Sequence, residues 1–155
     1  MKVVIVGIGK TNETYLDQGI QVYLKRLIHY TNFELMWLPD VKKFSNTEDL
    51  LHKEGEQFLK VIQNDDYVVL CDEGGKIFSS KGLASFIEQR QIESTKRLIF
   101  IIGGAFGLAA NVRARANLLF SLSNLTFSHQ MIRLFLIEQV YRAFTIIQNE
   151  KYHNE

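Results

Sequence analysis

Cysteine is nearly absent from this sequence of 155 residues, and Cys71 is the only one. A single cysteine cannot form an internal disulfide, which indicates a reducing compartment. Long apolar runs are absent too. None approaches the ~20 residues of a membrane span, and the first one ends at Gly7, too early for a signal peptide. These absences argue against a disulfide-stabilised secreted protein and predict a cytoplasmic protein without a membrane partner.

An excess of one charge is also lacking, because 18 Lys and Arg residues are balanced by 17 Asp and Glu residues, for a net charge of +1. This balance neither demands nor excludes a nucleic-acid partner, since a basic patch can exist within a balanced total. The length fits one domain, residues 1–155, and a chain of this size buries roughly two-thirds of its unfolded surface. Its core therefore needs no metal ion or disulfide.

Apolar runs typical of buried strands alternate with segments that have the spacing of amphipathic helices. Strands are expected at 3–6, 33–38, 67–71, 98–102 and 118–121. Helices are expected at 14–30, 45–62, from Ser79 past Ile87, over a short piece within 108–117, and from the N-cap Ser128 to 148. Ser45 with Glu48 matches a capping box, and 72–76 is expected to be a turn. The alternation predicts an α/β fold with a mainly parallel sheet flanked by helices.

The strand at 98–102 leads directly into Gly103, Gly104 and Gly107, and this stretch is the centre of the chain. Glycine permits positive φ and exposes backbone N–H groups that side chains would otherwise cover. Ligands of open α/β sheets bind beyond the carboxyl ends of the strands. The stretch is therefore either a binding site or a plain tight turn.

The turn after the first strand matches neither of two nucleotide-binding fingerprints. The pattern G-x-G-x-x-G needs glycine where Asn12 stands, and a phosphate-binding loop that ends in Gly9, Lys10 and Thr11 needs glycine where Val4 stands. A flavodoxin-like or nicotinamide-dependent enzyme is thereby disfavoured.

Residues 122–127 alternate apolar with small polar side chains and precede a helix with almost no polar face. The loop is expected to be sheltered from water. A domain of this size has little room to surround such a helix, so we expect a homodimer packed through it. The polar residues 149–155 predict a frayed tail.

Four segments together carry a family resemblance: 102–107 (IGGAFG), 122–133 (LSNLTFSHQMIR), 138–144 (EQVYRAF) and the terminal pair Tyr152 and His153. With them, the whole chain resembles the H-type methyltransferases of bacterial large-subunit ribosomal RNA, which are minimal members of the SPOUT superfamily. The resemblance implies a C-terminal trefoil knot, an obligate homodimer and S-adenosylmethionine as methyl donor. The implied acceptor is N3 of a pseudouridine in 23S rRNA, in the large ribosomal subunit or the whole ribosome.

The resemblance assigns the donor site to two single positions and one loop: Leu70, Gly103, and Leu122, Ser123, Asn124, Leu125, Thr126 and Phe127. Backbone groups of the loop are expected to bond the adenine edge, with three leucines packing its faces. Without the resemblance, Leu70 is simply a core residue. No metal is expected, because the sulfonium donor carries its own activation.

The resemblance assigns Arg142, Tyr152 and His153 to the RNA side, on a tail that is ordered when substrate binds and can act on the other subunit's donor. Arg142 offers a fork for phosphate, Tyr152 or His153 can stack on an extruded base, and His153 is a conceivable base. Terminal residues of these types are often inert. His129 and Arg133 either hold the knot or face RNA. The family often has proline at Ser128, and some members have a basic residue at Asn154. The alternative function is a non-catalytic RNA-binding or ribosome-associated module.

Overall fold

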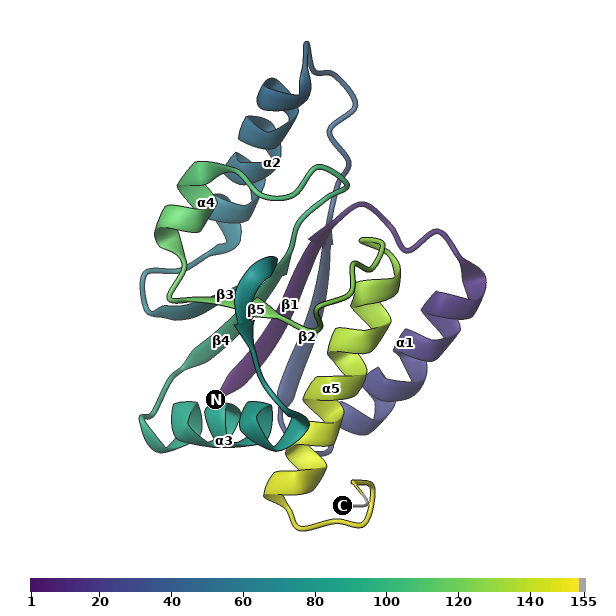
Figure 1. The fold of residues 1–155 in the computed structure, drawn as a ribbon, viewed down its shortest axis with the longest axis vertical. Coiled ribbons are helices and arrows are strands. Elements are labelled where there is room, and N and C mark those ends of the chain that lie inside the picture. The colour runs from purple at the N-terminus through teal and green to yellow at the C-terminus, as the bar shows by residue number, and fades with distance from the viewer. Residues whose placement is uncertain (154–155) are drawn as a thin grey trace.

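A computed structural model describes residues 1–153, in which strands and helices alternate (Figure 1). Asn154 lies outside the described residues. The elements in chain order are β1 (Lys2–Ile8), α1 (Thr14–Leu27), β2 (Asn32–Leu38), α2 (Thr47–Val61), β3 (Asp66–Ile77), α3 (Ser80–Ile92), β4 (Arg97–Ile102), α4 (Ala110–Arg115), β5 (Leu118–Ser121) and α5 (Met131–Ile147). The predicted α/β alternation is confirmed.

The five strands form one sheet in the order β2-β1-β4-β3-β5, and all four pairings between them are parallel. All carboxyl ends consequently meet at one edge. The central strand β4 is buried on both faces, as its unbroken apolar run predicts.

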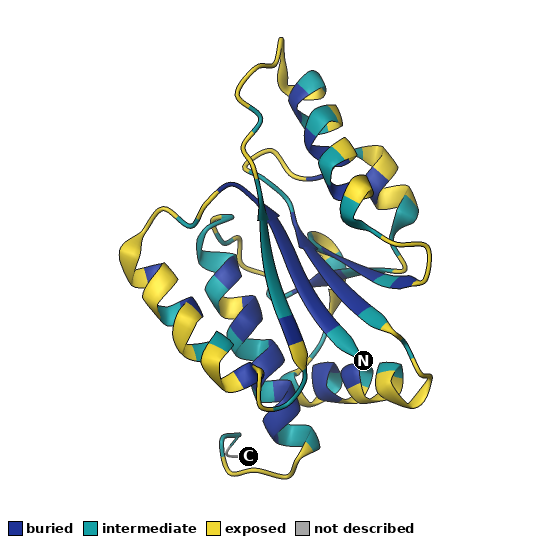
Figure 2. Cartoon of the chain, turned by 180° about the vertical axis from the view of Figure 1, so that it is seen from behind, coloured by how far each residue is buried: buried dark blue, intermediate teal, exposed yellow. Residues whose placement is uncertain are grey.

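Alternate residues of the strands supply two apolar cores, one on each face of the sheet. Ile5 and Phe100 face one side, where α1, α3 and α5 cover the sheet, whereas Val6 and Ile101 face the other side, where α2 and α4 lie. Figure 2 shows the buried strands enclosed between these helices, whose outer surfaces are exposed. The domain thus has three layers.

The third strand continues through residues 72–76, where the sequence predicts a turn. Cys71 and Lys76 both pair with Phe120, so the intervening residues form a bulge beside β5. A Cβ atom on Gly75 would lie 2.5 Å from the backbone nitrogen of Phe120. The prediction of a turn was wrong because glycine here serves a close approach of two backbones.

Two of the three predicted helix caps differ in detail from the structure. Ser79 caps α3 as predicted, with its hydroxyl accepting from the N–H of Gly82 at 3.0 Å. The cap of α2 is Asn46 instead of Ser45, and its side chain accepts from the N–H of Asp49 at 2.9 Å. The helix α5 begins at Met131, whose N–H donates to the Ser128 hydroxyl at 3.1 Å.

One copy of the chain already covers most of α5, which packs against both α1 and α3 (Figure 1). Leu136, Ile137, Val140 and Phe144 are each at most 1% exposed, although Phe135 is 38% exposed. The single chain therefore buries one side of the helix without surrounding it completely, and the homodimer stays a prediction. Across residues 1–153, no helix combines the length and the apolar character that crossing a membrane requires.

Candidate functional site

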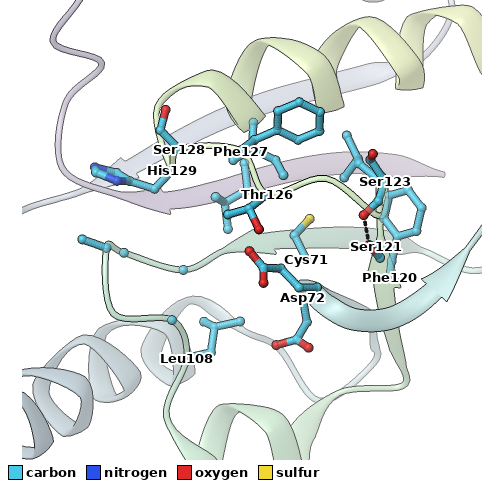
Figure 3. Close-up of a pocket in the computed structure, with 18 of the residues that line it drawn as sticks. Cys71, Asp72, Leu108, Phe120, Ser121, Ser123, Thr126, Phe127, Ser128 and His129 are labelled. Atoms are coloured by element: carbon cyan, nitrogen blue, oxygen red, sulfur yellow. Dashed lines mark hydrogen bonds between the residues drawn. The ribbon is translucent and has the colours of Figure 1, made fainter.

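A cavity of about 540 Å³ lies beyond the carboxyl ends of β4 and β5 and beside the middle of β3 (Figure 3). Its walls come from the middle of β3, the glycine-rich turn after β4 and the loop after β5. Most small-molecule sites have volumes in this range, and open parallel sheets hold their ligands at this edge. The cavity is therefore the candidate binding site.

The turn after β4 is compact because three of its residues are glycine. The N–H of Gly107 donates to the carbonyl oxygen of Gly104 at 3.2 Å, and Gly107 has a φ of 89°. A Cβ atom on Gly103 would lie 2.6 Å from the carbonyl oxygen of Gly107. All three glycines also line the cavity. The tight turn and the cavity wall are thus one feature.

The loop after β5 forms the opposite wall. The Ser121 hydroxyl donates to the carbonyl oxygen of Ser123 at 2.8 Å, and the Ser123 hydroxyl accepts from the N–H of Leu125 at 2.9 Å. Residues 122, 123 and 125–127 line the cavity, whereas Asn124 does not. Residues 124–126 are exposed, with Leu125 at 72%. The expectation of a sheltered loop was wrong for these three residues.

The middle of β3 contributes Cys71 and Asp72, which sequence reasoning missed. Figure 3 shows both side chains beside Thr126 of the opposite loop. Leu70 is fully buried in the core that faces α2 and α4 and does not line the cavity. Period-two alternation along the strand places the following residue at the cavity. Burial raises the pKa of the Cys71 thiol to about 12, so this wall residue is a neutral thiol.

Arg133 is 1% exposed and anchors the start of α5. Its guanidinium donates to the carbonyl oxygens of Ile8 at 2.5 Å and Gly9 at 3.0 Å, and it lies 4.5 Å from the centre of the Trp37 ring. Of the two roles left open by the sequence, Arg133 therefore holds the chain together. His129 lines the cavity, and burial together with the charge of Arg133 lowers the pKa of its imidazole.

Arg142, Tyr152 and His153 lie together on the second half of α5 and the tail. Arg142 pairs with Glu138 at 2.6 Å, and its other terminal nitrogen is 3.3 Å from Nδ1 of His153. The Tyr152 hydroxyl donates to Glu138 at 3.0 Å, and the Tyr152 ring packs on that of Tyr141. The expectation of a frayed tail was wrong as far as residue 153, because aromatic packing and these bonds hold it.

This second group lies apart from the cavity within one chain. Arg142 is about three turns, or roughly 16 Å, beyond the start of α5, and neither it nor the two tail residues line the cavity. In residues 1–153, no group of three or more His, Cys, Asp and Glu side chains is placed to hold a metal ion.

The parallel sheet flanked by helices defines a domain of the α/β class, with a candidate binding cavity at the edge of the sheet. A family model described as "Predicted SPOUT methyltransferase" matches residues 1–153. The chain belongs to the SPOUT methyltransferase family, which confirms the resemblance inferred from the sequence.

Full-length relatives share nearly half of their residues with this chain. A protein of Christiangramia forsetii named "Ribosomal RNA large subunit methyltransferase H" is 49% identical over 156 residues, covering 99% of each chain. Proteins of the same name from Parabacteroides distasonis and Halothermothrix orenii are 45% and 42% identical, covering 100% and 99% of each chain.

Proposed function

We propose that this protein transfers the methyl group of S-adenosylmethionine to N3 of a pseudouridine in 23S rRNA, in the large ribosomal subunit or the whole ribosome. The names of its full-length relatives support ribosomal RNA as the substrate. The cytoplasm, where ribosomes are assembled, is the proposed location.

The observation that carries the proposal is that the backbone of residues 122–127, at the cavity, pairs with no other backbone group of the described residues. In the described part of the chain, no backbone-to-backbone hydrogen bond involves these six residues. The Leu125 N–H and the Ser123 carbonyl already bond serine hydroxyls. The other N–H and C=O groups of these residues are available to a heterocycle that needs both donors and acceptors. Ile102, Phe120 and Leu122 supply apolar surface beside them. This combination suits an adenine ring.

The remaining proposed contacts with the methyl donor follow from the same geometry. Cys71 takes the place that the resemblance assigns to Leu70, and the absence of a side chain at Gly103 lets a ligand approach the backbone. When bound, S-adenosylmethionine supplies a methyl group from its sulfonium, and the sulfur that remains is a neutral thioether. The chain has to hold the acceptor nitrogen in line with that methyl group, and positioning of this kind contributes several kcal/mol.

The acceptor side needs a second copy of the chain. Since Arg142, Tyr152 and His153 lie about three helical turns from their own cavity, we propose a homodimer packed through α5 in which they serve the partner's cavity. Arg142 would bind phosphate, the tyrosine ring would stack on the target base, and His153 would accept its proton. The C-terminal trefoil knot implied by the family is part of this proposal.

Two measurements test the function. Calorimetry of the purified protein should show binding of S-adenosylmethionine, whereas a cavity that binds none favours the non-catalytic RNA-binding module. Mass spectrometry of 23S rRNA nucleosides from a strain without the gene should show loss of N3-methylpseudouridine. The unaltered gene and the Gly82→Ala control should restore it. Gly103→Ala should not, because its Cβ would lie 2.6 Å from the carbonyl oxygen of Gly107.

A further inference from the structure

One end of the cavity carries charged side chains from two elements. Asp72 and Glu73 belong to β3, and Arg113 belongs to α4. Arg113 and Asp72 form an ion pair between these elements, and the other oxygen of the Asp72 carboxylate accepts from the N–H of Gly74 at 3.0 Å. Asp72 is therefore held on two sides and fixes the guanidinium at the cavity wall.

Arg113 and Glu73 keep most of their hydrogen-bonding capacity. The guanidinium has five N–H donors, but Arg113 donates only to Asp72 among the residues from 1 to 153. Its side chain is 42% exposed. The Glu73 carboxylate has no hydrogen bond or ion pair with any described residue. A ligand in the cavity can therefore meet one cation and one anion that are both available.

We infer that Arg113 binds the α-carboxylate of the amino-acid part of the methyl donor, and that Glu73 faces its α-ammonium group. This inference rests on the proposed function. S-adenosylmethionine carries both groups on one carbon, and arginine binds carboxylates through two parallel hydrogen bonds. Asp72 is a positioning residue, because it holds the guanidinium without contacting the ligand.

An RNA phosphate fits this end of the cavity less well than a zwitterion does. Two carboxylates face one guanidinium, so the local charge is negative and repels phosphate. Burial and the charge of Arg133 lower the pKa of the His129 imidazole, which disfavours its positively charged form. A ligand with one charge of each sign matches this wall.

Calorimetry of the full chain with four adenosyl probes tests the inference. S-adenosylmethionine and S-adenosylhomocysteine carry the carboxylate, whereas decarboxylated S-adenosylmethionine and methylthioadenosine lack it. Arg113→Gln should weaken binding of the first two about tenfold or more and leave the other two within about twofold. Glu73→Gln should weaken every probe except methylthioadenosine. The control Lys96→Gln, which removes a surface cation paired with Asp65, should change none.

A double-variant cycle tests the role of Asp72. Asp72→Asn should weaken the two carboxylate probes less than Arg113→Gln does, and the double variant should bind them no more weakly than Arg113→Gln alone. Additive losses would show that Asp72 acts independently of Arg113 and would overturn its positioning role.

The outcomes separate the inference from the function on which it rests. Equal weakening of all four probes by Arg113→Gln, or an unchanged affinity for S-adenosylmethionine, overturns the inference alone. Failure of the unaltered protein to bind any probe overturns the proposed function and the inference with it. Retained binding of methylthioadenosine by Arg113→Gln shows that this variant is folded.

Discussion

Arg133 donates a hydrogen bond to the carbonyl oxygen of Ile8 at 2.5 Å and thereby joins the start of α5 to the end of β1. The two residues are 125 positions apart in the sequence. Further bonds to Gly9 and Thr11 complete the contact. The loop 122–130, which forms one wall of the cavity, is therefore fixed at its far end by a buried arginine.

Arg133→Met should destabilise the protein by about 3 kcal/mol, because it leaves the buried carbonyl groups of Ile8 and Gly9 without their donor. Urea unfolding measures this change. Arg133→Lys keeps the charge but loses the planar fork, so we expect an intermediate loss. A loss below about 1 kcal/mol for Arg133→Met would show that water replaces the guanidinium at little cost.

Gly75→Ala should destabilise the protein by about 2 kcal/mol or more, because its Cβ would come within 2.5 Å of the β5 backbone. The atoms in the way are backbone atoms, so no flexible side chain can move aside. Gly74→Ala is the matched control, since its Cβ would meet only the Asp72 carboxylate, at 3.3 Å. Thermal unfolding of both variants compares them. Equal losses would mean that loss of glycine flexibility, and not the close approach, sets the effect.

Glu54→Gln should alter how stability depends on pH. Burial, and then the charge of Asp40, raise the pKa of this carboxyl above its usual 4.5. Between 4.5 and the raised value, the folded state binds more protons than the unfolded state, so Glu54 lowers stability as pH rises through that window. The variant should therefore gain stability relative to the unaltered protein between pH 4 and pH 8, as urea unfolding would measure. The exposed neighbour variant Glu56→Gln should show no such gain, and a parallel gain in it would contradict the assignment to Glu54.

His153→Ala should lower turnover on rRNA while leaving the affinity for S-adenosylmethionine unchanged, because its proposed role is to accept a proton from the target base and not to bind the methyl donor. Single-turnover methylation and calorimetry separate the two quantities. His153→Gln keeps a polar side chain at the contact with Arg142 and should retain the folded tail. Unchanged turnover in His153→Ala would remove this residue from the proposed acceptor side.

Local pattern predicted the layers of the fold but not the contacts between distant segments. The run 98–102 identified the central strand, because only a strand covered on both faces needs unbroken apolar residues. The extension of β3 was missed, since Gly74 and Gly75 indicate a turn unless the neighbouring backbone of β5 is known. The order of the tail likewise depends on Tyr23, which lies 129 positions from its partner Tyr152.

The candidate site was predicted in part. Gly103 and most of the loop 122–127 do line the cavity, because glycine clustering and unusual polarity are visible in the sequence. Leu70 does not line the cavity, whereas Cys71 and Asp72, which follow it on β3, do. The sequence did not reveal that β3 continues past Cys71, nor which of its residues reach the cavity. No sequence pattern indicated a role for Arg113, because that role depends on an ion pair between two elements, β3 and α4.

Trp37, the only tryptophan of the chain, lies beneath the Arg133 guanidinium and against Gly7, where a Cβ atom would come within 3.0 Å of its ring. Indole emission from this protein therefore arises at a single place, the junction of β1, β2 and α5. A fluorescence trace of the unlabelled protein recorded during refolding would consequently follow the assembly of this three-element junction.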